Sequence, residues 1–226
     1  MDVPQLWLNA LQGTLILFFA GGALALVLGI IVGTMRVSPI PVARAVGTVY
    51  VNWIRNTPLT LVMFFFAFCI PILMAQRVSS LVLATIALGV YTATYVAETI
   101  RSGVNTVPVG QAEAARALGL GFGQVMSLVV LPQAFRSVIP PMVSVFIALL
   151  KNTTVAAGFA VLNLGSVALY LSEIREPGRR DNLLETMMSG GNLLLTLILI
   201  ALIFVVMVLL LAWLQRALEK KWRVER

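Results

Sequence analysis

GQAEAARALGLGFGQVMSLVVLPQAF, residues 110–135, decides the fold, because it begins as a polar segment between long apolar runs. Residues 111–118 are alanine, glutamate, glutamine, arginine and leucine, which favour a helix. Gly119, Gly121 and Gly123 then allow the chain to turn, and Pro108 stands just before the start. The stretch predicts a short helix followed by a turn. Physics alone leaves two roles open: docking on a partner, or merely connecting spans at the interface.

The rest of the chain is strongly apolar. Of 226 residues, 60% are hydrophobic and 11% are charged, whereas a soluble domain has about 25% charged residues. About 20 apolar residues cross a bilayer. We therefore expect an all-α polytopic membrane protein, one domain over residues 1–226, with five spans and a cytoplasmic loop over 103–137. The expected spans are approximately 12–35, 55–76, 80–102, 138–171 and 192–215.

The charges predict an orientation and exclude several classes of function. With the C-terminus inside, eleven of the sixteen lysines and arginines are cytoplasmic and four lie outside, so we expect the N-terminus outside. The net charge of +7 sits between apolar runs without interleaved aromatic residues, which does not indicate a nucleic-acid partner. With no histidine and one cysteine, Cys69, the sequence excludes an internal disulfide and a His/Cys metal cluster.

Three features of residues 113–132 carry a family resemblance. Glu113-Ala114-Ala115, then Gly119, then Leu131-Pro132 has the spacing of the EAA motif, so the chain resembles ABC importer permeases. Val129 stands where the motif has isoleucine. The segments NTPLTLV, VAETIRSGVNTV and GQAEAARALGLGFG are similar to the polar amino-acid branch, and resemble actinobacterial glutamate/glutamine permease subunits. The resemblance covers roughly residues 10–215 and weakens after Gly158.

The resemblance implies a type I ABC importer fold and an assembly. The chain would be the transmembrane permease subunit of an ATP-driven amino-acid importer in the bacterial plasma membrane, with glutamate or glutamine favoured. Its implied partners are a cytoplasmic ABC ATPase dimer, a second and different permease chain, and an extracellular substrate-binding protein. The implied coupling residues are Gln111, Glu113, Ala114, Ala115, Arg116 and Gly119, with Arg116 or Arg101 as partner of Glu113.

The chain itself lacks the means to use ATP. A P-loop needs GxxxxGK[ST], whereas the lysines here stand at 151, 220 and 221 and none follows a glycine. We therefore expect no enzyme activity and no cofactor in this chain, with ATP and Mg²⁺ on the partner ATPase. Two alternatives are a gradient-driven secondary carrier and a non-transporting membrane scaffold. A short carrier would be expected to show a paired repeat, which the sequence does not.

A second polar stretch, ALLKNTTVAAG at 148–158, interrupts the fourth run. Residues 138–171 would measure about 51 Å as a straight helix, more than the core of about 30 Å. We expect a break, with Thr153 or Thr154 capping a half-helix that begins near Val155 and faces an amino acid's carboxylate. Lys151 would add a charge to that path. Alternatively, Lys151 pairs with a protein carboxylate, while Asn152 and the threonines bond across helices.

Further polar residues are candidates for the same path. Asn163 could line it or form a hydrogen bond between helices. Arg55, Asn56 and Thr57 could face the cavity, the alternative being Thr57 as N-cap with Pro58 in the first helical position. Glu98 and Arg101, three residues apart, are expected to form a structural ion pair.

Overall fold

The computed structural model describes residues 3–75, 78–169 and 192–222, which are mainly helical and contain no strand. Within these residues four helical stretches are long and apolar enough to cross a membrane: Pro4–Val37, Ser80–Asn105, Phe122–Phe159 and Thr196–Lys220. A bent pair of helices would make a fifth span. The predicted all-α polytopic class is confirmed.

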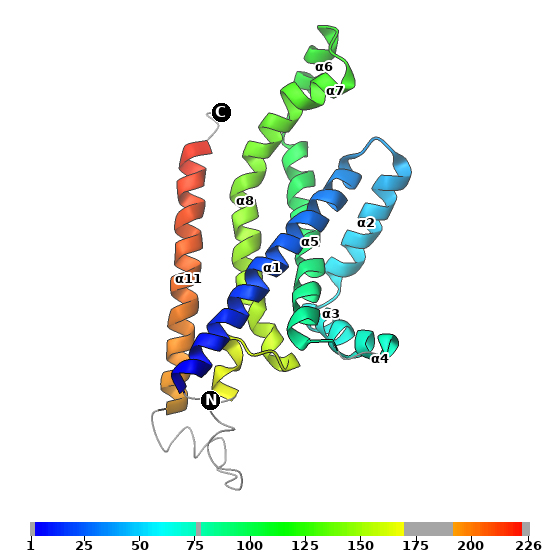
Figure 1. Ribbon diagram of the computed structural model, residues 1–226. Helices are drawn as coiled ribbons and strands as arrows, with labels where there is room; N and C mark the ends of the chain where they lie inside the picture. The colour runs from blue at the N-terminus through cyan, green and yellow to red at the C-terminus, as the bar shows by residue number, and fades with distance from the viewer. Residues whose placement is uncertain (1–2, 76–77, 170–191, 223–226) are drawn as a thin grey trace. The chain divides into compact units, whose positions relative to one another are not determined.

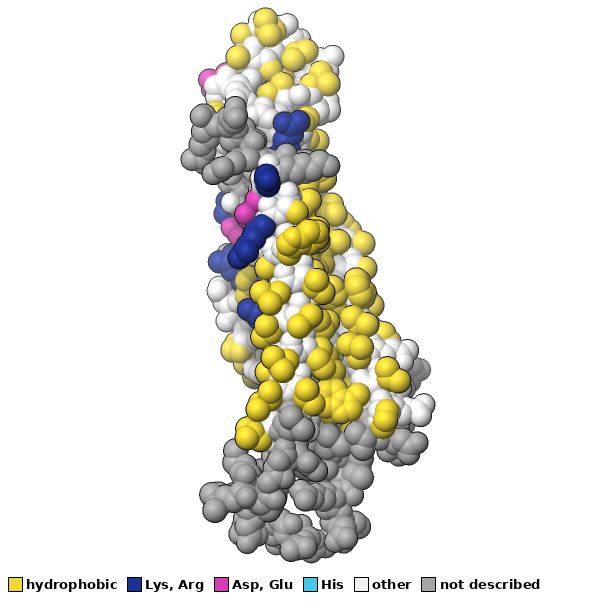
Figure 2. Space-filling view, turned by 90° about the vertical axis from the view of Figure 1, so that its left-hand side faces the viewer, with side chains coloured by type: hydrophobic (Ala, Val, Ile, Leu, Met, Phe, Trp, Pro, Cys, Tyr) yellow, Lys and Arg dark blue, Asp and Glu magenta, His cyan; other side chains and the backbone are white. Residues whose placement is uncertain are grey.

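The first and last long helices show why the sequence forms spans. α1 (Val3–Val37) and α11 (Asn192–Trp222) are almost continuous apolar sequence. Large apolar side chains of α11, such as Leu202, Val206 and Leu210, stay exposed, which an aqueous protein would not tolerate along a whole helix. Figure 2 shows the same distribution: hydrophobic side chains cover most of this face, and the charged ones gather in one part of it.

The predicted span at 55–76 is wrong in shape. α2 (Pro41–Asn56) has Thr57 as its C-cap. After a bend of 101° follow α3 (Leu59–Phe64), η1 (Phe65–Cys69), which is a π-helix, and α4 (Ile70–Met74). Pro58 is the cause, because a residue before proline is pushed out of the helical region. Thr57 is accordingly extended, with φ −89° and ψ 131°. α2 itself was not among the predicted helices.

α5 (Ser80–Asn105) agrees with the predicted third span to within three residues, and the loop after it differs in extent. Figure 1 shows α6 (Val109–Ala117) and α7 (Phe122–Gln124) following α5, and then η2 (Val125–Val130), a π-helix, and α8 (Leu131–Asn152). The short predicted helix is present, but helical structure resumes at Phe122 rather than at 138. Pro132 follows the π-helix η2 directly, at the second residue of α8.

The fourth run is interrupted where the polar residues stand. α8 ends at Asn152, η3 (Thr153–Phe159) continues as a tighter 3₁₀ helix, and Ala160 turns the chain with φ 56°. A single 3₁₀ turn, η4 (Leu164–Ser166), follows. The predicted end at Leu171 lies outside the described residues. The helix therefore ends at Phe159, and the Asn163 side chain bonds back to the Thr153 carbonyl.

The chain divides into two compact units. The first unit comprises residues 1–21, 59–88 and 148–210, and the second comprises 22–58, 89–147 and 211–226. Six buried residues form a core of the first unit: Leu6, Ala10, Leu164, Val167, Ala168 and Ile200. In the second unit α1 and α5 approach closely, because Gly29 and Gly33 leave room for Val96 and Ile100. The prediction of one domain over residues 1–226 stays a prediction.

Candidate functional site

The predicted coupling segment is a short, mostly exposed helix that packs on the rest of the second unit along one face. On α6, Gln111, Glu113, Ala114 and Arg116 are exposed, and only Ala115 is buried. Ala115 packs against Val125 and Val130 in a small apolar cluster of the second unit. One face of α6 is therefore anchored, and the other is free for contact.

Gly119 produces the turn that ends α6. Its φ is +86°, and no atom lies near the position of a Cβ, so the backbone conformation alone selects glycine. The Gly119 N–H donates to the Arg116 carbonyl at 2.9 Å, and the Leu120 N–H donates to the Ala115 carbonyl at 3.2 Å. These bonds satisfy carbonyls at the helix end. Gln133 Nε2 also donates to Gln111 Oε1 at 2.6 Å, which ties α6 to α8.

A cluster of three arginines surrounds one carboxylate in the second unit. Arg101 Nε donates to Glu98 Oε1 at 3.2 Å, Arg36 Nη1 donates to Glu98 Oε2, and Arg55 Nη1 lies 3.7 Å from Glu98 Oε2. The Arg36 side chain is 9% exposed, against 37% for Arg101 and 44% for Arg55. We call these four residues the Glu98 cluster. Within the described residues every ion pair involves Glu98.

This cluster decides several expectations. The predicted Glu98–Arg101 pair is confirmed. The suggestion of Arg101 as partner of Glu113 is wrong, because Arg101 is engaged by Glu98; no ion pair of the described residues includes Glu113. Arg55 joins the Glu98 cluster, and its role in a solute path stays a prediction. Asn56 is the last residue of α2 and is exposed.

Thr57 does not take the N-cap position considered for it. Its hydroxyl donates to the Trp53 carbonyl at 2.8 Å, so it closes α2 instead of opening the next helix. α3 begins at Leu59, which places Pro58 before the helix rather than in its first position. The local reason is that Pro58 forces Thr57 into an extended conformation, in which the Thr57 hydroxyl reaches the last turn of α2.

The interrupted segment of the first unit is held by buried polar groups. Asn163 Nδ2 donates to the Thr153 carbonyl at 3.1 Å, and Asn163 Oδ1 accepts from the Ser166 N–H at 3.2 Å. Thr14 Oγ1 on α1 accepts from the Leu164 N–H at 2.9 Å. Asn163, Thr153 and Thr14 have no exposed surface. Irregular backbone at membrane depth is tolerated where protein satisfies it, as here.

The predicted capping by Thr153 or Thr154 is wrong. The Thr153 hydroxyl donates to the Leu150 carbonyl and the Thr154 hydroxyl donates to the Lys151 carbonyl, both at 2.7 Å. Each threonine therefore bonds backward, because the chain continues as a 3₁₀ helix without a new start near Val155. Asn163 acts as a cap instead, at η4, and its side chain is buried. Its part in a solute path stays a prediction.

Lys151 stands alone at the end of α8. It is exposed, and no ion pair among the described residues involves it. Asn152 beside it is half-buried. An ionisable residue within a span normally faces a wet cavity or another protein chain. The arrangement leaves the ammonium available for an anionic group.

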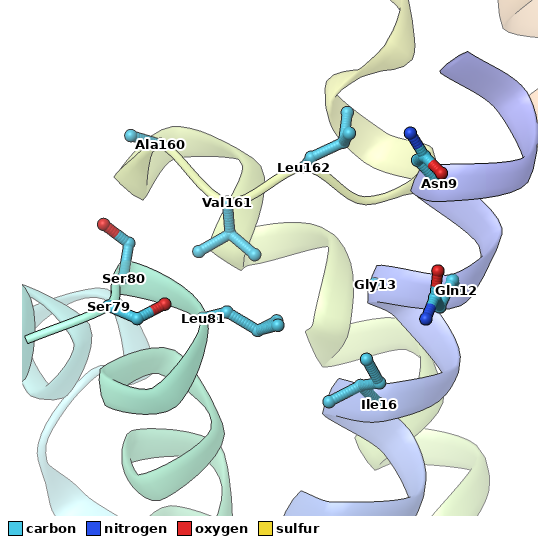
Figure 3. Close-up of a pocket in the computed structure, with 10 residues that line it drawn as sticks. All are labelled: Asn9, Gln12, Gly13, Ile16, Ser79, Ser80, Leu81, Ala160, Val161 and Leu162. Atoms are coloured by element: carbon cyan, nitrogen blue, oxygen red, sulfur yellow. The ribbon is translucent and has the colours of Figure 1, made fainter. Parts of the chain in front are cut away.

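A pocket of about 450 Å³ lies in the first unit (Figure 3). Asn9, Gln12, Gly13 and Ile16 of α1 form one side, and Ser79, Ser80 and Leu81 form another. The turn Ala160–Leu162 supplies the third side. The residues that line this pocket are partly polar, and none of them is charged. Gly13 is required here, because a Cβ would collide with the Leu162 carbonyl oxygen.

Thr14 and Arg36 were not among the predicted site residues. Thr14 could have been found as a hydroxyl within the first apolar run, but nothing local pointed to its partner 150 residues away. Arg36 directly follows the first expected span, 12–35. Its side chain folds back onto α5, where it meets Glu98, 62 residues later in the chain.

The fold and the exposed loop helix define a class: a polytopic helical membrane protein with a short exposed helix between two spans. Residues 25–224 match the family described as the binding-protein-dependent transport system inner membrane component. The chain belongs to this family.

Similar proteins agree with this assignment. The chain is 42% identical over 180 residues to the glutamate transport system permease protein GluC of Corynebacterium glutamicum, covering 75% of each chain. It is 37% identical over 163 residues to the probable glutamine ABC transporter permease protein GlnM of Bacillus subtilis, covering 72% of this chain and 75% of the relative. A crystal structure of an amino acid ABC transporter with histidines matches with a TM-score of 0.83 and 26% identity, over 96% of this chain and 94% of that one.

Proposed function

We propose that the chain is the transmembrane permease subunit of an ATP-driven amino-acid importer, with glutamate or glutamine as passenger. Family membership supports the permease role, and the names of the Corynebacterium and Bacillus relatives support the passenger. The separate ATPase holds ATP and Mg²⁺, and alternating access in the permease moves the amino acid.

The exposed face of α6 is the observation that carries this proposal. Glu113, Ala114 and Arg116 are exposed on a helix whose other face packs through Ala115. Gly119, with a positive φ, then turns the chain, so that α6 ends before α7 begins. A short anchored helix of this kind suits docking in a groove of the ATPase. Nucleotide-driven movement of the groove would then move the permease.

The solute path is proposed around Lys151. Its exposed ammonium can attract the α-carboxylate of an amino acid, or the side-chain carboxylate of glutamate. Asn152 and Thr154, both half-buried, follow it and offer neutral polar groups. Arg55, Asn56 and Thr57 belong to the second unit, and their part in the path is proposed on sequence grounds alone.

The remaining partners follow from the assembly of binding-protein-dependent systems. We propose an extracellular substrate-binding protein, a second permease subunit of different sequence, and a cytoplasmic ATPase dimer. The permease lies in the bacterial plasma membrane with its N-terminus outside and its C-terminus in the cytoplasm. The excess of lysine and arginine in the segments then assigned to the cytoplasm supports this orientation.

Co-purification tests the proposal. The chain is expressed with its neighbouring transport genes, extracted in mild detergent and isolated through a tag on this subunit. We expect an ATPase and a second permease to co-purify. In proteoliposomes, glutamate or glutamine with the binding protein should stimulate ATP hydrolysis more than arginine does.

Two results would contradict the proposal. Uptake that runs on an ion gradient without ATP would indicate a secondary carrier. Recovery of a cytoplasmic partner without any uptake would indicate a scaffold. The Glu113→Lys variant is the internal control for docking, because it should abolish co-purification of the ATPase while membrane insertion stays normal.

A further inference from the structure

A continuous chain of buried hydrogen bonds joins α1 to the end of α8 in the first unit. Thr14 Oγ1 accepts from the Leu164 N–H at 2.9 Å. Asn163, the next residue back, donates from Nδ2 to the Thr153 carbonyl at 3.1 Å. Thr153 in turn donates its hydroxyl to the Leu150 carbonyl at 2.7 Å, within the last turn of α8. Lys151 lies between these last two residues in the sequence.

Asn163 and Ser166 make this chain of bonds stiff. The Ser166 hydroxyl donates to the Asn163 carbonyl at 2.9 Å and accepts from the Asn163 N–H at 3.0 Å, while the Ser166 N–H donates to Asn163 Oδ1. Both residues are almost without exposed surface. Every polar atom named here has a partner, and a fully satisfied buried network specifies one geometry.

The backbone around this network is closely packed. A Cβ at Gly13 would collide with the Leu162 carbonyl oxygen, and one at Gly165 would stand 3.0 Å from Asn163 Oδ1. Ala160 keeps a left-handed conformation, with φ 56°, although it is not glycine. Such conformations persist only where the surroundings over-determine them. The segment 153–166 therefore has one position on α1.

We propose that Thr14, Asn163 and Ser166 are positioning residues for the solute path. Together they form a latch that fixes the interrupted segment against α1, and thereby sets where Lys151 is presented. The inference rests on the proposed function in one respect: it takes Lys151 as the residue that meets the passenger's carboxylate.

The same latch sets the width of the pocket in Figure 3. One wall of that pocket is α1, with Asn9 and Gln12, and another is the turn Ala160–Leu162. Thr14 stands on α1 next to Gly13, and Leu164 stands two residues after that turn. The Thr14–Leu164 bond therefore fixes the two walls relative to one another. Loosening it should displace the pocket wall and the end of α8 together.

The geometric test uses spin labels in the full transporter. Cys69→Ser removes the chain's single cysteine, and Leu8→Cys on α1 and Gly158→Cys in η3 then carry nitroxides. Leu8 is exposed, and a side chain at Gly158 meets nothing within 4 Å. Thr14→Val keeps the shape of the side chain but leaves the buried Leu164 N–H without an acceptor. We expect Thr14→Val to broaden the distance distribution and Thr14→Ser to leave it narrow.

The functional test measures glutamate-stimulated ATP hydrolysis. We expect Thr14→Val to raise the half-saturating glutamate concentration about five- to tenfold, the equivalent of about one lost hydrogen bond, with the maximal rate retained. A change in half-saturation without a change in rate marks lost solute binding rather than lost folding. Thr14→Ser should restore the wild-type value. Thr85→Val is the matched control, because its hydroxyl bonds only to the Leu81 carbonyl of its own helix.

The two tests separate the two claims. An unchanged distance distribution in Thr14→Val would overturn the latch. A broadened distribution with half-saturation unchanged, or with rate and stability falling together, would overturn the positioning role. If wild-type protein responds to neither glutamate nor glutamine, the proposed passenger fails, while the spin-label distances still decide the latch.

Discussion

Removing the carboxylate of Glu98 should destabilise the permease far more than removing one of its exposed partners. Glu98→Gln leaves the Arg36 guanidinium, whose side chain is only 9% exposed, without its counter-charge. Breaking a buried ion pair costs about 3–5 kcal/mol. Because Glu98 itself is 26% exposed and water can reach the cluster, we expect about 2–3 kcal/mol.

Arg55→Gln is the matched comparison within the same cluster. Its side chain is 44% exposed and its Nη1 lies 3.7 Å from the Glu98 carboxylate. Exposed pairs contribute about 0.2–1 kcal/mol, so this variant should lose that much at most. Arg101→Gln, at 37% exposure with hydrogen bonds from two nitrogens, should fall between the two.

The assay is thermal unfolding of each purified variant in mild detergent, with the wild-type complex measured in parallel. Glu98→Gln should melt lowest and Arg55→Gln close to wild type. The double variant Arg36→Met with Glu98→Leu should lose less than the sum of the losses of Arg36→Met and Glu98→Leu alone, because the buried guanidinium of Arg36 is removed together with its counter-charge, and the arginines that remain, Arg55 and Arg101, are exposed. Equal losses of stability in Glu98→Gln and Arg55→Gln would refute the reasoning, since burial of the unpaired charge would then not decide how much stability is lost.

Three further predictions concern the coupling turn, Lys151 and the close approach at Gly13. Gly119→Ala should reduce stimulated ATP hydrolysis at least severalfold with membrane insertion intact, because a side chain at φ +86° is strained. Gly123→Ala is the control, because Gly123 has open space around it and no positive φ. Equal effects of the two variants would contradict the role of the turn. Lys151→Ala should weaken amino-acid-stimulated ATP hydrolysis more than basal hydrolysis, whereas the control Lys220→Ala should change neither. If Lys151→Ala lowers stimulated and basal hydrolysis equally, the partner of Lys151 is a protein carboxylate rather than the amino acid. Gly13→Ala should lower the melting temperature by several degrees, because its Cβ would clash with the Leu162 carbonyl oxygen. Gly110→Ala should not lower it, because nothing lies near its Cβ position. If Gly13→Ala melts at the wild-type temperature, α1 can move aside to relieve the clash.

The sequence predicted the spans best where hydrophobicity alone decides them. α5 and α11 begin where the apolar runs begin, at 80 and 192. α2 was missed because Arg44 and Arg55 lower its mean hydropathy, although its apolar residues recur on one helical face. Its bend is encoded locally at Pro58, so closer attention to the residue before proline would have predicted the break.

The sequence predicted those parts of the candidate site that depend on residues close together in the chain. The helix at 111–118 and the turn at Gly119 depend on neighbouring residues, and both are present. The Glu98–Arg101 pair follows from a spacing of three on one helix. Arg36 and Thr14 could not be connected to their partners, which lie 62 and 150 residues away, because such contacts depend on how the helices pack. The Thr153 and Thr154 hydroxyls bond backward because the chain continues as a 3₁₀ helix after Asn152, which the sequence alone did not predict.

The exposed surface of α6 and its turn has a consequence for the life of the subunit in the cell. Val109, Leu118 and Phe122 are 72%, 84% and 56% exposed, so in the proposed topology this loop offers large apolar side chains to the cytoplasm until a partner covers them. Surfaces of this kind attract chaperones and invite aggregation and proteolysis. A newly made copy without its ATPase should therefore be short-lived. The amount of this permease would then follow the supply of its partner, and matched synthesis of the two would act as quality control on assembly.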